Sequence, residues 1–428
     1  MKEYLYINAH KTVQIEYADK TKKSVQKVFI SGSEYIFDEQ DKLNPNKMDY
    51  AQKTKREMYT RFLNNQFENL IFLSGAGTSI GFGNIDRKGK AMANLWDDAV
   101  DILGDKDFID LLKAIKYDTQ LKDVDSNEIP SNIILKGDKC VLNRNLEAVL
   151  SLATPAIPYI DVNIVNIALC VDKIKTMIKN ACDLTFDSTQ APHLQLLNKL
   201  TKRRVTLPRF KLFTLNYDLM FEQAASEGNF VVIDGFSYTF PRIFSGRNFD
   251  YDIVNRHKSR VKEEDNFIER VFHLYKPHGS LNWEKKGNHI IQSEKNDNPL
   301  MIYPHSNKYE SSYDQPYFEM MSRFQNNLRL DNTLLITIGF SYGDKHIVTA
   351  IKEAVEQNPS FQLLIVSRSI DEKNPNMQPF IELAKQYSNI HILAESFADF
   401  SKYYPDLKSY NHDESQRLTI KLPFQDEK

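Results

Sequence analysis

The stretch NLIFLSGAGTSIGFG, residues 69–83, is the part of the sequence on which the fold assignment depends. An apolar run at 70–73 leads directly into a glycine-rich turn, GAG, at 75–77. A turn of this kind at the end of a buried strand can hold a phosphate. The dinucleotide-binding fingerprint needs a third glycine three residues after the second, but that position is Ile80, and Gly81 comes one residue late. The stretch therefore predicts either no dinucleotide site or one of another kind.

Further strand-like stretches follow the first one at a distance, each succeeded by a helical or loop segment. They lie at 210–215, 270–275, 333–339, 361–366 and 389–394. Apolar strands that alternate with helices are typical of a parallel sheet buried on both faces. The sequence therefore predicts an α/β fold, a Rossmann-like doubly wound parallel sheet.

The remaining segments flank or interrupt this sheet. Three short β-prone runs precede residue 31, and the apolar residues of 164–178 recur at helical spacing. We therefore expect a small N-terminal β extension and a helical insert within the sheet domain. The expected divisions are a β-rich arm at 1–49, the first part of the sheet domain at 50–104, the helical insert at 105–204, the remainder of the sheet domain at 205–405 and a C-terminal tail at 406–428.

Composition excludes several classes of protein. The chain has 428 residues, of which 41% are hydrophobic and 26% charged, as in ordinary soluble globular proteins. A net charge of −2 provides no general attraction for nucleic acid, so we expect such contact only indirectly, through a partner. No secretory signal and no apolar run of membrane-spanning length is found. The three cysteines form no C-x-x-C pair, so we expect a cytoplasmic protein with reduced thiols and no metal.

Small and polar residues follow the expected strands. They are GAGTS at 75–79, NYD at 216–218, KPHGS at 276–280, GFSYGD at 339–344 and SR at 367–368. Because the carboxyl ends of parallel strands meet at one edge of a sheet, we expect these residues to lie close together and to contact a nucleotide.

Each of these segments taken alone has a purely structural alternative. A G-A-G turn can be no more than a tight turn that glycine permits. Asn-Tyr-Asp after a strand is often an Asx turn or a helix cap. A single histidine is more often a structural residue than a catalyst, although its pKa suits acid–base work. The segment 341–344 can be an ordinary loop and cap before a helix.

The motifs are more specific in combination. GAGTS, the T-x-N-Y-D of 214–218, the HGSLNW of 278–283 and the IGFSYGDKHI of 338–347 occur in this order. Together they resemble the sirtuin-like NAD-consuming family, over roughly 69–97 and 205–400. In that family a variant G-A-G turn holds the NAD pyrophosphate by its backbone N–H groups, so the missing third glycine does not count against NAD. The family cleaves the bond between nicotinamide and ribose instead of transferring hydride.

The resemblance also implies roles for individual residues. Asn216 is expected to position water near the ribose, Asp218 to hold the carboxamide or order the pocket, and His278 to act as general base. Positive charge develops on the ribose as nicotinamide leaves, as in glycoside hydrolysis. The residues expected to contact NAD are Gly75, Ala76, Gly77, Thr78, Ser79, Thr214, Tyr217, Gly279, Gly339, Ser341 and Ser367.

Other features indicate which branch of the family the chain resembles. Deacylase sirtuins usually carry a four-cysteine zinc module, and no cysteine follows Cys182. The Leu-Asn-Trp after the histidine and the large insert resemble the bacterial anti-phage defence branch, whose members hydrolyse NAD+ to ADP-ribose and nicotinamide and abort infection.

Partners are expected by analogy with that branch. The chain has no G-x-x-x-x-G-K-[ST] motif, so we expect a trigger supplied in trans. We expect a homo-oligomer and a complex with a HerA-type ATPase. Two alternatives stay open: a non-catalytic module that binds NAD or ADP-ribose and gates a partner, and an NAD-dependent protein deacylase.

Overall fold

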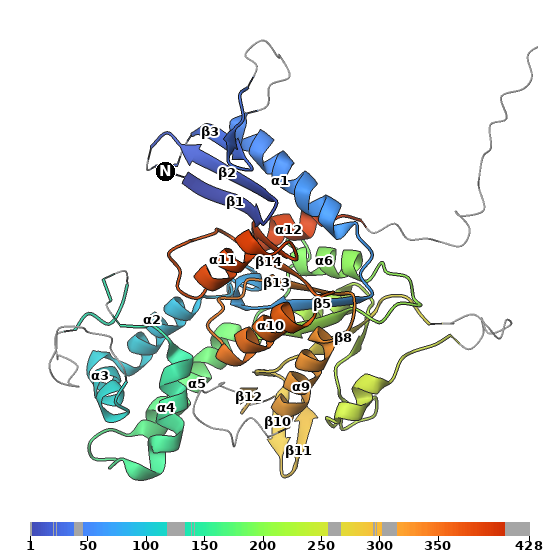
Figure 1. The fold of residues 1–428 in the computed structure, drawn as a ribbon. Helices are drawn as coiled ribbons and strands as arrows, with labels where there is room; N and C mark the ends of the chain where they lie inside the picture. The colour runs from blue at the N-terminus through green and yellow to red at the C-terminus, as the bar shows by residue number, and fades with distance from the viewer. Residues whose placement is uncertain are drawn as a thin grey trace, which may run out of the picture.

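One sheet of eleven strands runs through the protein (Figure 1). The structure is a computed structural model and describes residues 2–19, 21–22, 24–37, 46–117, 133–137, 139–140, 142–255, 267–293, 296, 298–301 and 315–406. Seven neighbouring strands are parallel: in spatial order, β15 (Ile390–Ala394), β14 (Gln362–Ser367), β13 (Thr333–Ile338), β5 (Asn69–Ser74), β6 (Lys211–Thr214), β8 (Val271–Tyr275) and β7 (Val231–Ile233). The predicted doubly wound α/β fold is confirmed.

The centre of this sheet lies at the pair β5 and β13. Every residue of both strands is buried, which explains their mostly apolar sequences. Their register runs from Thr333 opposite Asn69 to Ile338 opposite Ser74, so the two strands end level with each other. The chain leaves β5 towards β6 on one side and returns at β13 on the other. The loops after β5 and β13 therefore meet at the topological switch point, where ligands of such sheets bind.

The N-terminal strands extend the same sheet. They are antiparallel and comprise β1 (Lys2–Asn8), β2 (Lys11–Tyr17), β3 (Val25–Ile30) and β4 (Ser33–Glu34). β1 pairs antiparallel with β15. Asn8 Nδ2 strengthens this junction, because it donates to the backbone carbonyls of Ser388 and Ile390, each at 2.9 Å. The predicted β extension is thus continuous with the central sheet.

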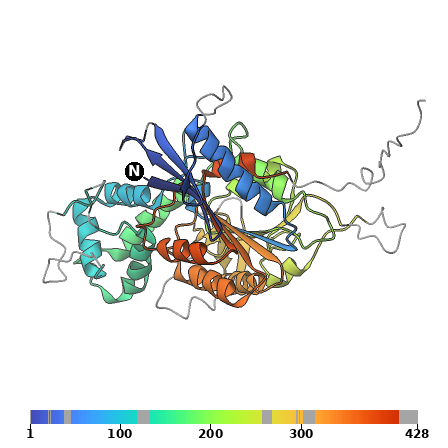
Figure 2. The ribbon, with the colours of Figure 1, turned by 45° about the horizontal axis from the view of Figure 1, so that its top comes forward.

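Helices cover both faces of the sheet (Figure 2). One face carries α9 (Tyr317–Leu328), α10 (Lys345–Gln357) and α11 (Gln378–Gln386). The other carries α1 (Lys47–Leu63), α6 (Pro192–Leu200), α7 (Met220–Glu227) and α12 (Phe397–Tyr403), with α6 in contact with both α7 and α12. None of the described helices is long and apolar enough to cross a membrane.

A helical lobe projects from one side of the sheet (Figures 1 and 2). It contains α2 (Met92–Leu103), α3 (Asp105–Ala114), α4 (Leu146–Ala156) with the 3₁₀ turn η2 (Ile157–Tyr159), and α5 (Ile167–Cys182). These helices bury their own core around Trp96, separate from the core of the sheet. Two residues of the sheet domain, Tyr217 and Leu281, reach into the lobe's core. The helices expected in the insert belong to two different cores. α3, α4 and α5 lie in the core of the lobe, whereas α6 packs into the core of the sheet.

Short elements complete the edge of the sheet where the loops gather. They are the 3₁₀ turns η1 (Ala76–Thr78) and η3 (Gly246–Asp250), the hairpin of β10 (Trp283–Lys286) with β11 (His289–Gln292), and the pair β9 (Gly279–Ser280) with β12 (Leu300–Met301). η1 follows β5 directly and β9 follows the β8 loop, so both lie beside the carboxyl ends of the central strands.

Candidate active site

The turns after β5 and β13 pack tightly against each other. Gly77 N–H donates to Gly339 O and Gly75 N–H donates to Ile338 O, each at 3.0 Å. A Cβ added to Gly75 would lie 2.5 Å from Gly339 O, and one added to Gly77 would lie 2.5 Å from Gly339 Cα. Gly339 itself has φ +62° and no room for a Cβ beside Gly77. All three positions therefore require glycine because two backbones meet there, whichever ligand binds.

Most backbone amides of the glycine-rich turn are engaged within the protein. Thr78 N–H donates to Gly75 O, and the N–H groups of Ser79 and Ile80 both donate to Ala76 O. Ala76 is exposed, and its N–H has no hydrogen-bond partner among the described residues. A phosphate that approaches the turn in this conformation would meet the Ala76 amide.

Buried hydroxyl and amide groups from two strand ends form one network beside this turn. Asn216 Nδ2 donates to Ser79 Oγ at 2.8 Å and to Thr78 Oγ1 at 3.1 Å. Thr78 Oγ1 hydrogen-bonds Ser74 Oγ at 2.7 Å, and Thr214 Oγ1 lies 3.5 Å from Ser74 Oγ. All five side chains are buried. Because both donated bonds fix the amide group, Asn216 is held in one orientation.

Asp218 connects this network to a helix. Ser79 Oγ donates to Asp218 Oδ2 at 2.6 Å, and Met220 N–H donates to Asp218 Oδ1 at 3.1 Å. A carboxylate at the first turn of α7 is stabilised by the unpaired amides and the dipole of the helix. Ser79 thus bridges Asn216 and Asp218, and the β5 and β6 loops are locked together.

His278 faces a carboxylate from the loop after β13. Its Nε2 lies 3.1 Å from Asp344 Oδ2, and the two side chains are 6% and 10% exposed. Asp344 Oδ1 also accepts from the N–H groups of His346 and Ile347 and so caps α10. Burial by itself would raise the pKa of Asp344, but the hydrogen bonds from His278 and the two amides outweigh it and lower that pKa. A charged carboxylate at this place favours the Nε2–H tautomer and leaves Nδ1 as the basic nitrogen.

A buried lysine joins the loops after β6 and β8. Lys276 Nζ donates to the backbone carbonyl of Asp218 at 2.5 Å and lies 2.9 Å from Glu222 Oε1. Leu281 N–H donates to the Tyr217 carbonyl at 3.1 Å. Next to His278, Gly279 has φ +88°, which a glycine adopts readily. The Asn-Tyr-Asp turn and the histidine are therefore parts of one connected structure.

The structure places the sequence-predicted residues unequally. Those in contact around the switch point are Gly75, Gly77, Thr78, Ser79, Thr214, Asn216, Asp218 and Gly339. Tyr217 turns its side chain into the helical lobe, where its hydroxyl donates to Glu147 Oε1 at 3.0 Å. Ser341 is exposed after β13, and Ser367 is half-buried at the end of β14, where its carbonyl accepts from Glu395 N–H.

Sequence reasoning missed several polar residues of the site. Lys276 and Asp344 were expected among the strand-end residues that contact a nucleotide, but not as partners of the Asn216–Asp218 turn and of His278. Ser74 is the last residue of an apolar strand, and its polarity there is the signal that marks it. Glu147 lies in the helical lobe, and nothing in its local sequence connects it with Tyr217.

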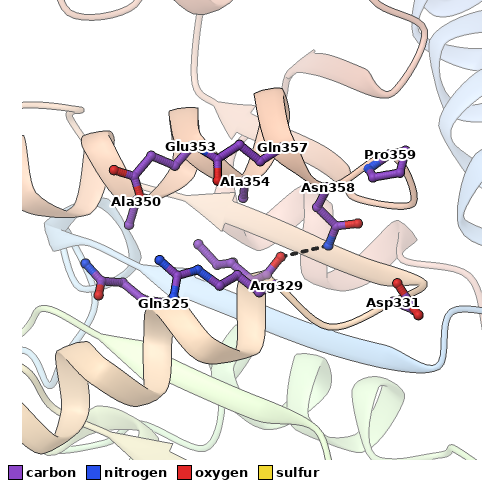
Figure 3. Close-up of a pocket in the computed structure, with 10 residues that line it drawn as sticks. Gln325, Arg329, Asp331, Ala350, Glu353, Ala354, Gln357, Asn358 and Pro359 are labelled. Carbon is purple, nitrogen blue, oxygen red and sulfur yellow. Dashed lines mark hydrogen bonds between the residues drawn. The ribbon is translucent and has the colours of Figure 1, made fainter.

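A surface groove lies between two helices away from these residues, and Figure 3 shows the side chains that line it. It measures about 220 Å³ and runs between α9 and α10, lined by Gln325, Arg329, Glu353 and Gln357 among others. Asn358 Nδ2 donates to Leu328 O beside it. Because α9 ends where β13 begins and α10 ends where β14 begins, the groove lies at the amino ends of the strands, opposite the predicted site.

The arrangement of His, Cys, Asp and Glu side chains indicates whether a metal ion could bind. Among the described residues, no group of three or more His, Cys, Asp or Glu side chains is arranged to hold a metal ion. The described site instead offers an imidazole, carboxylates, an amide and hydroxyls, which suit hydrogen bonding to hydroxyl and amide groups of a ligand.

Comparisons with known proteins agree with part of the sequence-based expectation. Residues 211–392 match the model of a family described as the SIR2-like domain. No match was found among curated proteins.

Two solved structures of Sir2 proteins align with most of the chain, though loosely. A mutant Sir2 homologue in complex with ADP-ribose has 12% identity and a TM-score of 0.34, and covers 85% of this chain and 99% of its own. A structure described under the mechanism and regulation of Sir2 enzymes has 10% identity and a TM-score of 0.32, with 82% and 97% covered. On the family match, residues 211–392, which include the loops of Asn216, His278 and Asp344, are similar to the SIR2-like domain.

Proposed function

We propose that the protein is an NAD+ hydrolase that cleaves NAD+ to ADP-ribose and nicotinamide. One observation carries the proposal: Asn216, Asp218 and His278 lie on connected loops at the carboxyl edge of the sheet, beside its switch point. The similarity of 211–392 to the SIR2-like domain supports an NAD-dependent activity for this edge.

The geometry suits a role for each of the three residues. His278 acts as general base through Nδ1, on a ribose hydroxyl or on water, while Asp344 stabilises the imidazolium that forms. Asn216 is preoriented by its bonds to Thr78 and Ser79, so its side-chain oxygen is available to position water near the ribose. Asp218 orders the nicotinamide end of the pocket.

Other atoms at this edge fit a polar ligand. The Ala76 amide is available for the pyrophosphate, beside the place where Gly77 and Gly339 let the two turns pack together. Ser280 Oγ and Asn282 Oδ1, close to His278 in sequence, are buried and have no hydrogen-bond partner in the described part of the chain. Buried polar atoms of this kind usually find a partner in a ligand or in water. Ser341, Ser367 and Thr214 complete the proposed NAD-contacting set, whereas Tyr217, whose side chain enters the helical lobe, attaches the turn to the lobe instead.

We further infer that the activity serves anti-phage defence, by depleting NAD+ within a complex. The resemblance to the defence branch supports this, together with a homo-oligomer and a HerA-type ATPase as partner. The lobe exposes several apolar side chains, among them Tyr159, Val162 and Ile164, which are 84%, 66% and 70% exposed. Exposed apolar groups that gather in one segment often mark a protein-binding surface.

Nicotinamide release from NAD+ tests the proposal. The purified protein is incubated with NAD+, alone and with its genomic neighbour, and light scattering records its oligomeric state. Replacing His278 with Ala should lower the rate at least about 100-fold, because a general base contributes about 10²–10⁴-fold. The matched control is His289→Ala, which removes an exposed histidine on the β10–β11 hairpin and should leave the rate unchanged.

Other outcomes would point to the alternatives. Turnover that survives in both His278→Ala and Asn216→Ala would exclude this site as the catalytic centre. Saturable NAD+ binding without turnover under any condition would favour a sensor module that gates a partner. Nicotinamide release only in the presence of an acylated protein would favour a deacylase.

A further inference from the structure

We propose that Lys276 is a positioning residue that holds the Asn216–Asp218 turn in its active geometry. Lys276 directly follows β8 and is 1% exposed. Its Nζ lies 2.5 Å from Asp218 O, 3.4 Å from Tyr217 O and 2.9 Å from Glu222 Oε1. The consequence for catalysis rests on the proposed function, whereas the structural role does not.

The contacts of Lys276 explain why a charge is retained inside the protein. Burial of an ammonium group is unfavourable unless acceptors surround it. Glu222 supplies the countercharge from the first turn of α7, and two consecutive backbone carbonyls supply the remaining acceptors. Burial raises the pKa of Glu222, and Lys276 opposes that rise. The pair thus anchors the start of α7 to the end of β8.

The turn depends on this anchor because it has no regular secondary structure of its own. Residues 215–219 lie between β6 and α7, so no strand ladder and no helical bonds fix the carbonyls of Tyr217 and Asp218. Lys276 takes up both, and Leu281 N–H shares the first of them. Asn216 precedes these two residues and Asp218 is one of them, so a shift of the turn moves both proposed catalytic side chains.

Lys276 also links the turn to the general base. It lies two residues before His278, and its own carbonyl accepts from Gly279 N–H at 3.0 Å. Together with the bond from Leu281 N–H to Tyr217 O, Lys276 therefore sets the separation of the loop that carries Asn216 and the loop that carries His278. A displacement of about 1 Å between reacting groups can lower a rate about 100-fold.

The test replaces Lys276 with Met, which keeps most of the side-chain volume and removes the charge. Its matched control is Arg203→Met: Arg203 Nη2 also donates to two consecutive backbone carbonyls, those of Phe67 and Glu68, but at the opposite end of β5. Hydrogen exchange followed by mass spectrometry is measured for each protein, with kcat and the Kd for NAD+. Lys276→Met should speed exchange in 215–220 and at Leu281, and lower kcat about 100-fold with Kd changed less than about threefold.

Each outcome of this experiment either supports or overturns the role proposed for Lys276. If Lys276→Met shows the same hydrogen exchange and the same kcat as Arg203→Met, the proposal is overturned. Lys276 would then have no effect on the turn beyond that of another buried cation. If Lys276→Met does not fold, Lys276→Gln, which keeps a neutral donor, should still show faster exchange confined to the turn, and wild-type exchange there would contradict the inference. Absence of turnover in the wild type would count against the proposed function alone, because the exchange result stands without NAD+.

Discussion

At the scale of single residues, the site is built from side chains that hold one another. Ser79 accepts from Asn216 and donates to Asp218, and Asp344 serves His278 and the first turn of α10 together. Such shared partners preorganise catalytic groups, because each orientation is fixed before a ligand arrives. Strand ends in the sequence mark Asp344 and Lys276, but not which groups they pair with, because those partners are set by how the loops meet in three dimensions.

Asp344→Asn tests the histidine–carboxylate pair. Asparagine caps helices as well as aspartate does, so the melting temperature at pH 7 should change little. The loss of charge should lower kcat about 10- to 100-fold, since His278 loses the group that stabilises its protonated form. A matched change is Asp161→Asn, which alters an exposed Asx turn in the lobe and should leave kcat alone. Equal kcat in the two variants would contradict a role for Asp344 in orienting His278.

At the scale of elements, the sequence predicted strands well and their connections less well. Six parallel strands lie at the expected places because each is a short, mostly apolar run, which local sequence suffices to mark. The pairing of β1 with β15 joins residues about as far apart as the chain allows, and no local pattern encodes it. The bonds from the Gly75 and Gly77 amides to Ile338 and Gly339 were equally hidden, since they depend on the register of β5 with β13.

Gly339→Ala tests the packing of the turn after β5 against the turn after β13. An alanine at φ +62° is strained by about 1 kcal/mol, and its Cβ would also collide with the Gly77 backbone, for a total of about 2–4 kcal/mol. Gly287→Ala is the matched control, because Gly287 has φ +58° and open space around it. Urea unfolding should show a loss of about 1 kcal/mol for the control. Equal losses in both variants would show that the two turns do not constrain each other.

At the scale of the whole molecule, the protein has two hydrophobic cores, one around the sheet and one in the helical lobe. The proposed site lies where the two cores meet. Tyr217 belongs to the turn of the site and to the core of the helical lobe, so the lobe is attached at the loop that carries Asn216 and Asp218. Near the same glycine-rich turn, His193 of α6 lies among Phe82, Phe221 and Phe397. Neither of its ring nitrogens has a hydrogen-bond partner within the described residues.

This buried histidine predicts sensitivity to acid. Burial lowers the pKa of His193 from 6.5 to about 3, so between these values the unfolded chain binds a proton that the folded protein does not. The stability therefore falls as the pH drops below about 6.5, by about 2 kcal/mol between pH 7 and pH 5 for this residue. His193→Phe should remove that part of the loss in urea unfolding, whereas the exposed His289→Phe should not. An unchanged pH dependence in His193→Phe would show that the ring is charged or solvated in the native state.

The central claim is that NAD+ binds and is cleaved at the carboxyl edge of β5, β6 and β8. The most direct measurement is an experimental structure of the His278→Ala variant with NAD+ bound. We predict the nicotinamide ribose within hydrogen-bond distance of Asn216, beside the space left at position 278, and the pyrophosphate near the Ala76 amide. NAD+ seated in the groove between α9 and α10, or elsewhere away from Asn216, would contradict it.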